Sequence, residues 1–195
     1  MGKRYRALIL DIDDTMVRTG IEWSVVRNRL REILGFELPR YPIAEYLVRH
    51  GSELPKEKMA LVEEVVKGEE LRSALSVESD PRLIHVLKKL KDAGYLIAVV
   101  TLRSKETAEL VLDRLGCLQH VDLILTRDSH ISRAEQLREA IKLLGVEARE
   151  VLFFGDHFTD HEAANELNID YVLVPKRSDV KGVPQELLSF LNNLV

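Results

Sequence analysis

The chain has 195 residues, enough for one domain with a modest insertion or for two small domains that share a cleft. Hydrophobic residues make up 46% and charged residues 31%, a composition that excludes a wholly disordered protein and allows a sizeable core. The 28 basic and 32 acidic side chains give a net charge of −4, which excludes an overall basic field for nucleic acid or an anionic membrane.

The cysteine content and the length of the apolar runs bear on the cellular location of the protein. The single cysteine, Cys117, cannot form an internal disulfide, and the apolar run 96–100 is far shorter than the roughly 18 residues of a membrane span. The N-terminus is basic, but the apolar stretch that follows it ends at Asp11 and is too short for a secretory signal peptide. We therefore expect a cytoplasmic protein with no nucleic-acid or membrane partner, and the oligomeric state stays open.

Five short apolar runs rich in β-branched residues predict strands. Each run is nearly continuous rather than alternating, which is typical of strands covered on both faces. The predicted strands are Tyr5 to Leu10, Leu96 to Thr101, Val121 to Thr126, Val151 to Phe154 and Tyr171 to Val174.

A helical pattern without a strand follows the first strand for about 60 residues. Its apolar spacing predicts helices over 23–34, 42–50 and 55–67. Such a segment is too long for a loop in a compact domain. We therefore predict a small helical domain, residues 17–79, inserted into a core domain made of residues 1–16 and 80–195.

Strands and helices alternate from residue 80 onward. Asp80, Ser104 and Ser132 each precede a helical pattern as an N-cap residue, and Thr159 with Glu162 predicts a capping box at a further helix. Because βαβ crossovers are right-handed, this order predicts an α/β fold with a mostly parallel sheet and helices on both faces.

Acidic residues follow two of the predicted strands. Asp11, Asp13 and Asp14 come directly after the first strand, and Asp156 and Asp160 follow the fourth. Open α/β sheets bind ligands at the carboxyl ends of their strands, and clusters of carboxylates there suit Mg²⁺. The alternative is that acid-rich turns simply end strands and cap helices.

A phosphate site is predicted where the second strand ends. Thr101 and Leu102 precede a helix that Ser104 can cap, and a helix N-terminus offers free N–H groups and a positive dipole to an anion. We expect the Thr101 hydroxyl and the Leu102 amide to contact phosphate. Ser104 acting only as a helix cap is the competing interpretation.

Three short motifs stand at the ends of these strands: Asp11-x-Asp13-x-Thr15, Thr101, and Gly155-Asp156-x-x-x-Asp160. In order and placement they resemble motifs one, two and four of the haloacid dehalogenase (HAD) superfamily. The helical insert is similar to the C1-type cap of phosphoglycolate-phosphatase-like members. The resemblance implies a Rossmann-like sheet of order 3-2-1-4-5 with an inserted helical cap domain.

The resemblance also implies roles for the matching residues. Asp11 would be the nucleophile and a metal ligand, and Asp13 the general acid/base and a ligand through its backbone. Asp156 would bind the metal, and Asp160 would support it directly or through water. The implied enzyme is a Mg²⁺-dependent phosphatase that hydrolyses a small phosphorylated metabolite through an aspartyl-phosphate.

Other functions remain open at this point. A phosphomutase shares these motifs, and a phosphate-binding module without catalysis is a further alternative. A dehalogenase is disfavoured, because family dehalogenases lack the acid that corresponds to Asp13.

One departure from the family concerns its third motif, a lysine. No lysine lies between Lys105 and Lys142, so we expect Arg133 to supply this charge and to bind phosphate, with Lys105 as the alternative. Arg133 could also be an ordinary solvated helix residue.

Substrate contacts from the insert are harder to predict. Arg18 and Trp23 are candidates because they lie close to the first acidic motif and because Arg and Trp are enriched at recognition sites. The alternative places Trp23 in the core of the insert, as its helical spacing indicates.

Overall fold

The computed structural model describes residues 4–38, 43, 46, 50, 53–130, 132–176 and 181–195. Its centre is a parallel sheet of order β3-β2-β1-β4-β5, which confirms the predicted order. All five predicted strands are present, and their predicted ends differ from the observed ends by at most two residues. The strands are β1 (Ala7–Leu10), β2 (Leu96–Val100), β3 (Leu123–Leu125), β4 (Val151–Gly155) and β5 (Asp170–Leu173).

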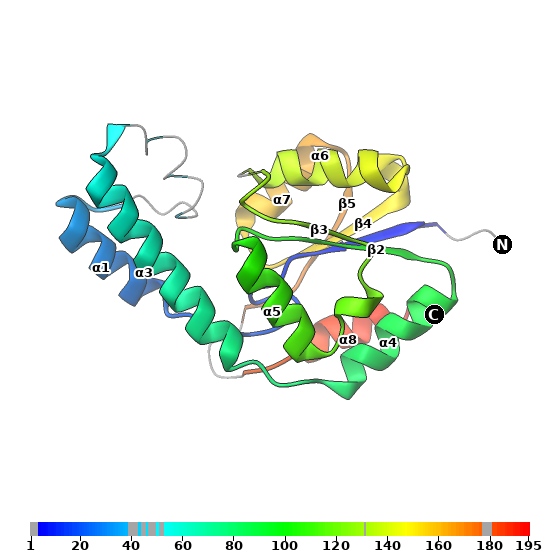
Figure 1. Cartoon of the computed structure of the whole chain (residues 1–195). Coiled ribbons are helices and arrows are strands. Elements are labelled where there is room, and N and C mark those ends of the chain that lie inside the picture. The colour runs from blue at the N-terminus through cyan, green and yellow to red at the C-terminus, as the bar shows by residue number, and fades with distance from the viewer. Residues whose placement is uncertain are drawn as a thin grey trace.

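Helices cover both faces of the sheet (Figure 1). Leu8 and Leu10 of β1 point into one core, which α4 (Pro81–Asp92), α5 (Lys105–Leu115) and α8 (Gln185–Asn192) complete. Ala7 and Ile9 point into the opposite core, against α6 (Arg133–Leu144) and α7 (Phe158–Glu166). Because both faces are buried in the centre of the sheet, β1, β2 and β4 carry no polar side chain.

Three helix starts match the predicted caps. The side chains of Asp80, Ser104 and Ser132 each accept a hydrogen bond from a backbone N–H in the first turn of α4, α5 and α6. Two short 3₁₀ turns, η2 (Leu118–His120) and η3 (Ala148–Glu150), lead into β3 and β4. The local capping signals are therefore sufficient to place the starts of α4, α5 and α6.

The start of α7 differs from the prediction. His157 is the N-cap residue, and its capping box closes with Asp160, so the predicted box of Thr159 with Glu162 is wrong. The imidazole Nδ1 accepts from the Thr159 N–H at 3.4 Å, and an Asp160 carboxylate oxygen accepts from the His157 N–H at 3.1 Å. The helix thus begins earlier than predicted, and its first turn fixes Asp160.

The insert contributes α1 (Trp23–Leu34) and α3 (Lys56–Leu75), which lie beside each other at one end of the sheet (Figure 1). Helix α3 continues eight residues beyond the predicted end at Lys67 and packs along α5. The helix predicted over 42–50 lies largely outside the described residues. Helices α1 and α3, together with Ile43, form a small core of their own. Its buried residues are Val26, Leu30, Leu34, Ile43, Val62 and Val66.

The separate core is consistent with an inserted domain, but the predicted boundaries at residues 16 and 80 stay a prediction. Although α3 has 20 residues, it carries charges along its length. Across the described ranges, no helix is both long and apolar enough to cross a membrane.

If the insert folds around its own core, damage to that core should stay local. Leu30→Ala removes a side chain that is 0% exposed and should cost about 2–5 kcal/mol of local stability. We expect faster amide hydrogen exchange in α1 and α3, with protection in β1 and β4 unchanged. Leu87→Ala, in the main core, is the matched control and should speed exchange in the sheet. Equal loss of protection in the sheet from both variants would contradict a separate unit.

Candidate active site

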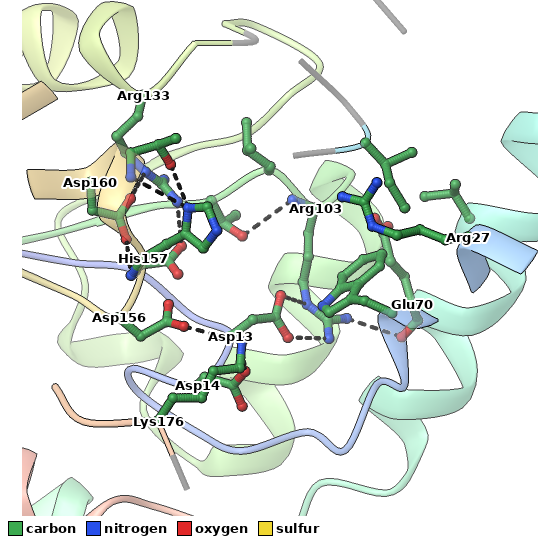
Figure 2. A pocket seen from close by; sticks show the side chains of 17 residues that line it. Asp13, Asp14, Arg27, Glu70, Arg103, Arg133, Asp156, His157, Asp160 and Lys176 are labelled. Carbon is green, nitrogen blue, oxygen red and sulfur yellow. Dashed lines mark hydrogen bonds and ion pairs between the residues drawn. The ribbon is translucent and has the colours of Figure 1, made fainter. Parts of the chain in front are cut away.

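A cavity of about 340 Å³ lies at the carboxyl ends of the central strands (Figure 2). The acids after β1 and β4 and the loop after β2 form its walls on the sheet side. Trp23 and Arg27 of α1 and Glu70 of α3 line it on the insert side. The cavity therefore stands at the edge where doubly wound sheets bind ligands.

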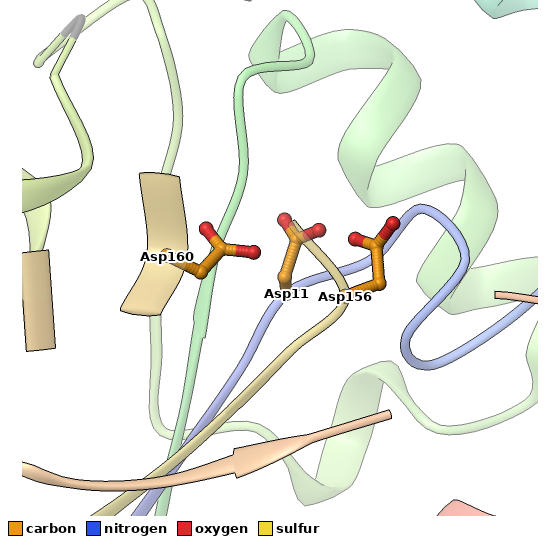
Figure 3. A group of neighbouring side chains, drawn as sticks. All are labelled: Asp11, Asp156 and Asp160. Carbon is orange, nitrogen blue, oxygen red and sulfur yellow. The ribbon is translucent and has the colours of Figure 1, made fainter. Parts of the chain in front are cut away.

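Three carboxylates converge on the floor of this cavity. Oxygen atoms of Asp11, Asp156 and Asp160 all lie within 4.8 Å of one another (Figure 3). Burial and the neighbouring acids raise the pKa of Asp11, against the lowering effect of Arg133. Burial also raises the pKa of Asp156 to about 6. Such a set of crowded, buried oxygen ligands fits a hard divalent cation, which would relieve the repulsion among them.

The close approach of Asp160 depends on Gly155. A Cβ atom at position 155 would lie 2.5 Å from one Asp160 carboxylate oxygen and 2.8 Å from the Asp160 Cβ. Any larger residue would push the first turn of α7 away from β4. Gly155 therefore allows Asp160 to reach Asp11.

Arg133 is the cation beside these carboxylates. It is the first residue of α6 and is buried. Its Nη2 donates to Asp11 Oδ1 at 2.8 Å and its Nε donates to Asp160 Oδ1 at 2.7 Å. Lys105, the alternative, is exposed and lies 3.8 Å from Glu109 on its own helix. The structure thus brings Arg133, and not Lys105, to Asp11.

A second cation, Lys176, was missed by the sequence reasoning. Its Nζ lies 2.6 Å from Asp14 Oδ2 and 3.3 Å from Asp156 Oδ2. Lys176 follows the end of β5, at the same edge of the sheet as the acidic motifs. Because the carboxyl ends of parallel strands meet at one edge of the sheet, the position of Lys176 after the fifth strand could have predicted its place beside the acids.

Asp13 is not part of the three-carboxylate cluster, because its side chain points toward Arg103 (Figure 2). Arg103 Nε donates to Asp13 Oδ2 and Nη2 donates to Oδ1, both at 2.8 Å. The Thr19 hydroxyl donates to Oδ1 at 2.8 Å. Burial raises the pKa of Asp13, but Arg103 and Thr19 outweigh burial and hold this pKa below its usual value. Arg103 is the second residue that sequence reasoning missed.

The predicted phosphate contacts lie on the cavity wall. Thr101 is 1% exposed, its hydroxyl accepts from the Arg103 N–H at 3.2 Å, and Leu102 is its neighbour on the same wall.

The two predicted insert contacts lie in different places. Trp23 lines the cavity, and Arg18 does not. Arg18 is buried and its Nη2 donates to the Pro175 carbonyl at 2.9 Å, with Glu186 at 3.6 Å. Arg18 therefore supports the loop after β5. Of the two predicted residues, Trp23 is the one placed to contact a substrate in the cavity.

Comparisons with known proteins agree with this architecture. Residues 8–174 match the family model of haloacid dehalogenase-like hydrolases. A haloacid dehalogenase-like hydrolase from Streptococcus pneumoniae superposes with a TM-score of 0.65 at 17% identity, over 96% of this chain and 91% of that one. At this identity the superposition shows the fold alone.

Two curated relatives are phosphatases. Phosphoglycolate phosphatase from Mesorhizobium japonicum is 30% identical over 48% of this chain, and the match spans 43% of that relative's length. N-acetylmuramic acid 6-phosphate phosphatase from Pseudomonas aeruginosa is 26% identical over 84% of this chain and 78% of its own. The sheet order, the acids at its carboxyl edge and the match over most of the sequence together show that the chain belongs to the haloacid dehalogenase-like hydrolase family.

Proposed function

We propose that the protein is a Mg²⁺-dependent phosphatase that hydrolyses a small phosphomonoester through a phosphorylated Asp11. The observation that carries the proposal is the contact of Asp11 with Arg133 inside a cluster of three carboxylates, of which Asp11 and Asp160 are buried and Asp156 is half-buried. This arrangement offers a nucleophile, a cation site and a fixed positive charge within one cavity. The two relatives named above act on phosphate esters of small molecules, as their names state.

The first step is an in-line attack by an Asp11 carboxylate oxygen on phosphorus. An O–P bond forms while the bond from phosphorus to the leaving oxygen breaks, and Asp13 gives that oxygen a proton. Asp13 must take up this proton when substrate binds, because the negative charge of the phosphate opposes the effect of Arg103 and Thr19 on its pKa. Arg133 stabilises the negative charge on the phosphoryl oxygens, because its guanidinium is fixed by Asp11 and Asp160 before the substrate arrives.

The second step regenerates the enzyme. Water attacks the phosphorus of the phosphorylated Asp11 and passes a proton to Asp13, so inorganic phosphate leaves and the Asp11 carboxylate returns. Thr101 and the Leu102 amide are proposed to orient the phosphoryl group in both steps, since both lie on the cavity wall. Splitting the hydrolysis in two helps with a reaction that is very slow without a catalyst.

Asp11, Asp156 and Asp160 would hold the metal ion, with the backbone of Asp13 as a further ligand. When bound, Mg²⁺ neutralises the charge that carboxylates and phosphate bring together. The insert, residues 17–79, is proposed to act as a cap over the cavity, with Trp23 against the leaving group.

Asp11→Asn tests the nucleophile. The amide has nearly the same shape as the carboxylate but cannot attack phosphorus, so turnover of p-nitrophenyl phosphate with Mg²⁺ should be abolished while thermal unfolding stays close to that of the wild type. Wild-type turnover in the purified variant would contradict the role of Asp11. Asp122→Asn, at an acid outside the cavity, is the matched control and should stay active.

Metal dependence is the next prediction. EDTA should abolish activity and Mg²⁺ should restore it, whereas Ca²⁺ should restore it poorly because its coordination is larger and looser. Since burial raises the pKa of Asp156 to about 6, protonation should weaken Mg²⁺ binding as the pH falls through this value. Calorimetric titration of Mg²⁺ at pH 8 and pH 5.5 measures this effect. Full activity in EDTA would contradict the metal site.

Arg133 should supply the charge that the family lysine provides. Arg133→Ala should lower kcat by about 10²- to 10³-fold, the usual cost of removing a fixed donor to a developing charge. Arg133→Lys should recover part of the loss, because a single ammonium replaces the two-pronged guanidinium.

Lys105→Ala is the matched control for this prediction and should remain active, as its side chain is exposed. An inactive Lys105→Ala beside a normal Arg133→Ala would reverse the assignment. If both variants keep full activity, the proposed phosphatase mechanism is wrong about its cation.

A further inference from the structure

We propose that Arg103 is a positioning residue that fixes the Asp13 carboxylate and makes its orientation depend on how helix α3 sits against the core. The inference rests on the phosphatase function proposed above. Arg103 is only 2% exposed, yet its guanidinium reaches a proposed catalytic acid on one side and the insert on the other. No motif of the sequence assigns a role to this residue.

The contact with Asp13 is a two-pronged ion pair. Nε and Nη2 of Arg103 each donate to a different oxygen of the Asp13 carboxylate at 2.8 Å. Two parallel hydrogen bonds to one carboxylate fix its plane as well as its position. Any rotation of the Asp13 side chain must therefore break at least one of them.

The opposite side of the same guanidinium contacts α3. Nη1 donates to the Glu70 carbonyl at 3.0 Å, and Nη2 donates to the Ser73 hydroxyl at 2.8 Å. Both acceptors are in one turn of α3, so a shift of this helix would move the partners of Arg103. Asp13 is thus connected to α3 through one buried side chain (Figure 2).

Helix α3 is held at this place by Glu70. Glu70 is 1% exposed. Its carboxylate accepts hydrogen bonds from the Ser104 N–H at 3.2 Å and from the Thr107 hydroxyl at 2.9 Å. It also pairs with Arg127, whose Nη1 donates to the Leu102 carbonyl at 2.8 Å. A buried carboxylate with several donors fixes the helix in one register against the loop after β2.

Both connections between the insert and the core meet at Asp13. Thr19, in the first connection, donates to Asp13 Oδ1, and Ser73, near the second, contacts Asp13 through Arg103. The position of the insert therefore determines the set of donors around the Asp13 carboxylate. If the insert moves as a cap, its movement would change the orientation of Asp13, the acid that protonates the leaving oxygen.

The test compares substrates whose leaving groups differ in their need for a proton. A nitrophenolate leaves readily without one, whereas an alkoxide does not, so misplacing Asp13 should affect an alkyl phosphate more than p-nitrophenyl phosphate. We would measure kcat/KM on glycerol 3-phosphate and p-nitrophenyl phosphate for the wild type, Arg103→Ala, Arg103→Lys and Ser73→Ala. This ratio reports the first step, in which the leaving group departs, and excludes the hydrolysis of phosphorylated Asp11 that both substrates share. Ser76→Ala is the matched control, because its hydroxyl bonds within α3 and does not reach Arg103.

We expect Arg103→Ala to lower kcat/KM on the alkyl phosphate by about 10²-fold, the usual effect of displacing a reacting group by about 1 Å, and to lower it much less on p-nitrophenyl phosphate. Arg103→Lys should recover part of the loss. Ser73→Ala should show a smaller loss with the same preference, and Ser76→Ala should match the wild type.

Equal losses of kcat/KM on both substrates in Arg103→Ala would overturn the positioning role, since a structural defect does not distinguish leaving groups. Equal behaviour of Ser73→Ala and Ser76→Ala would overturn the dependence on α3. If Arg103→Ala fails to fold, Arg103→Lys and Ser73→Ala decide the question on the same two substrates. A wild type that releases no phosphate from either substrate would instead refute the proposed phosphatase function.

Discussion

The crowding of carboxylates at one edge of the sheet is the constraint on which the rest of the site depends. Repulsion between two such charges about 5 Å apart is on the order of 3 kcal/mol at an effective dielectric of 20. Arg133, Lys176 and Arg103 each contact at least one of these acids, yet burial, together with the remaining repulsion, keeps the pKa of Asp11 and Asp156 raised. A site built in this way favours further positive charge, and it accepts a phosphate dianion only with cations present.

Much of the fold could be predicted from local signals. The continuous apolar runs predicted the strands, right-handed crossovers predicted a mostly parallel sheet, and the resemblance to the family implied the order β3-β2-β1-β4-β5. Because the carboxyl ends of parallel strands meet at one edge of the sheet, the sequence predicted that Asp11, Asp156 and Asp160 lie together, as they do. The predicted start of α7 is wrong because Thr159 and Glu162 match the usual capping-box residues, whereas the observed box uses His157 and Asp160, with Asp160 packed closely against Gly155.

The residues that sequence reasoning missed act through partners far away in the chain. The sequence places Arg103 in the loop after β2, but it does not show the partners of this residue, because Asp13 and Ser73 come from two other segments. The periodicity of α3 gave no sign that its last turns would pack on the core, because its buried polar residues Glu70 and Ser73 look solvent-exposed in a helical pattern. Arg18 has the residue type of a substrate contact, and only the tertiary structure shows it beneath the loop after β5.

The central claim is that Asp11 carries the phosphoryl group during turnover. The most direct measurement is to quench the wild-type enzyme with acid while it turns over p-nitrophenyl phosphate with Mg²⁺, reduce any acyl phosphate with borohydride, and map the modified residue by peptide mass spectrometry. The account predicts modification at Asp11 and at no other residue. Modification at a different side chain, or phosphate release by direct attack of water with no modified residue at any quench time, would contradict it.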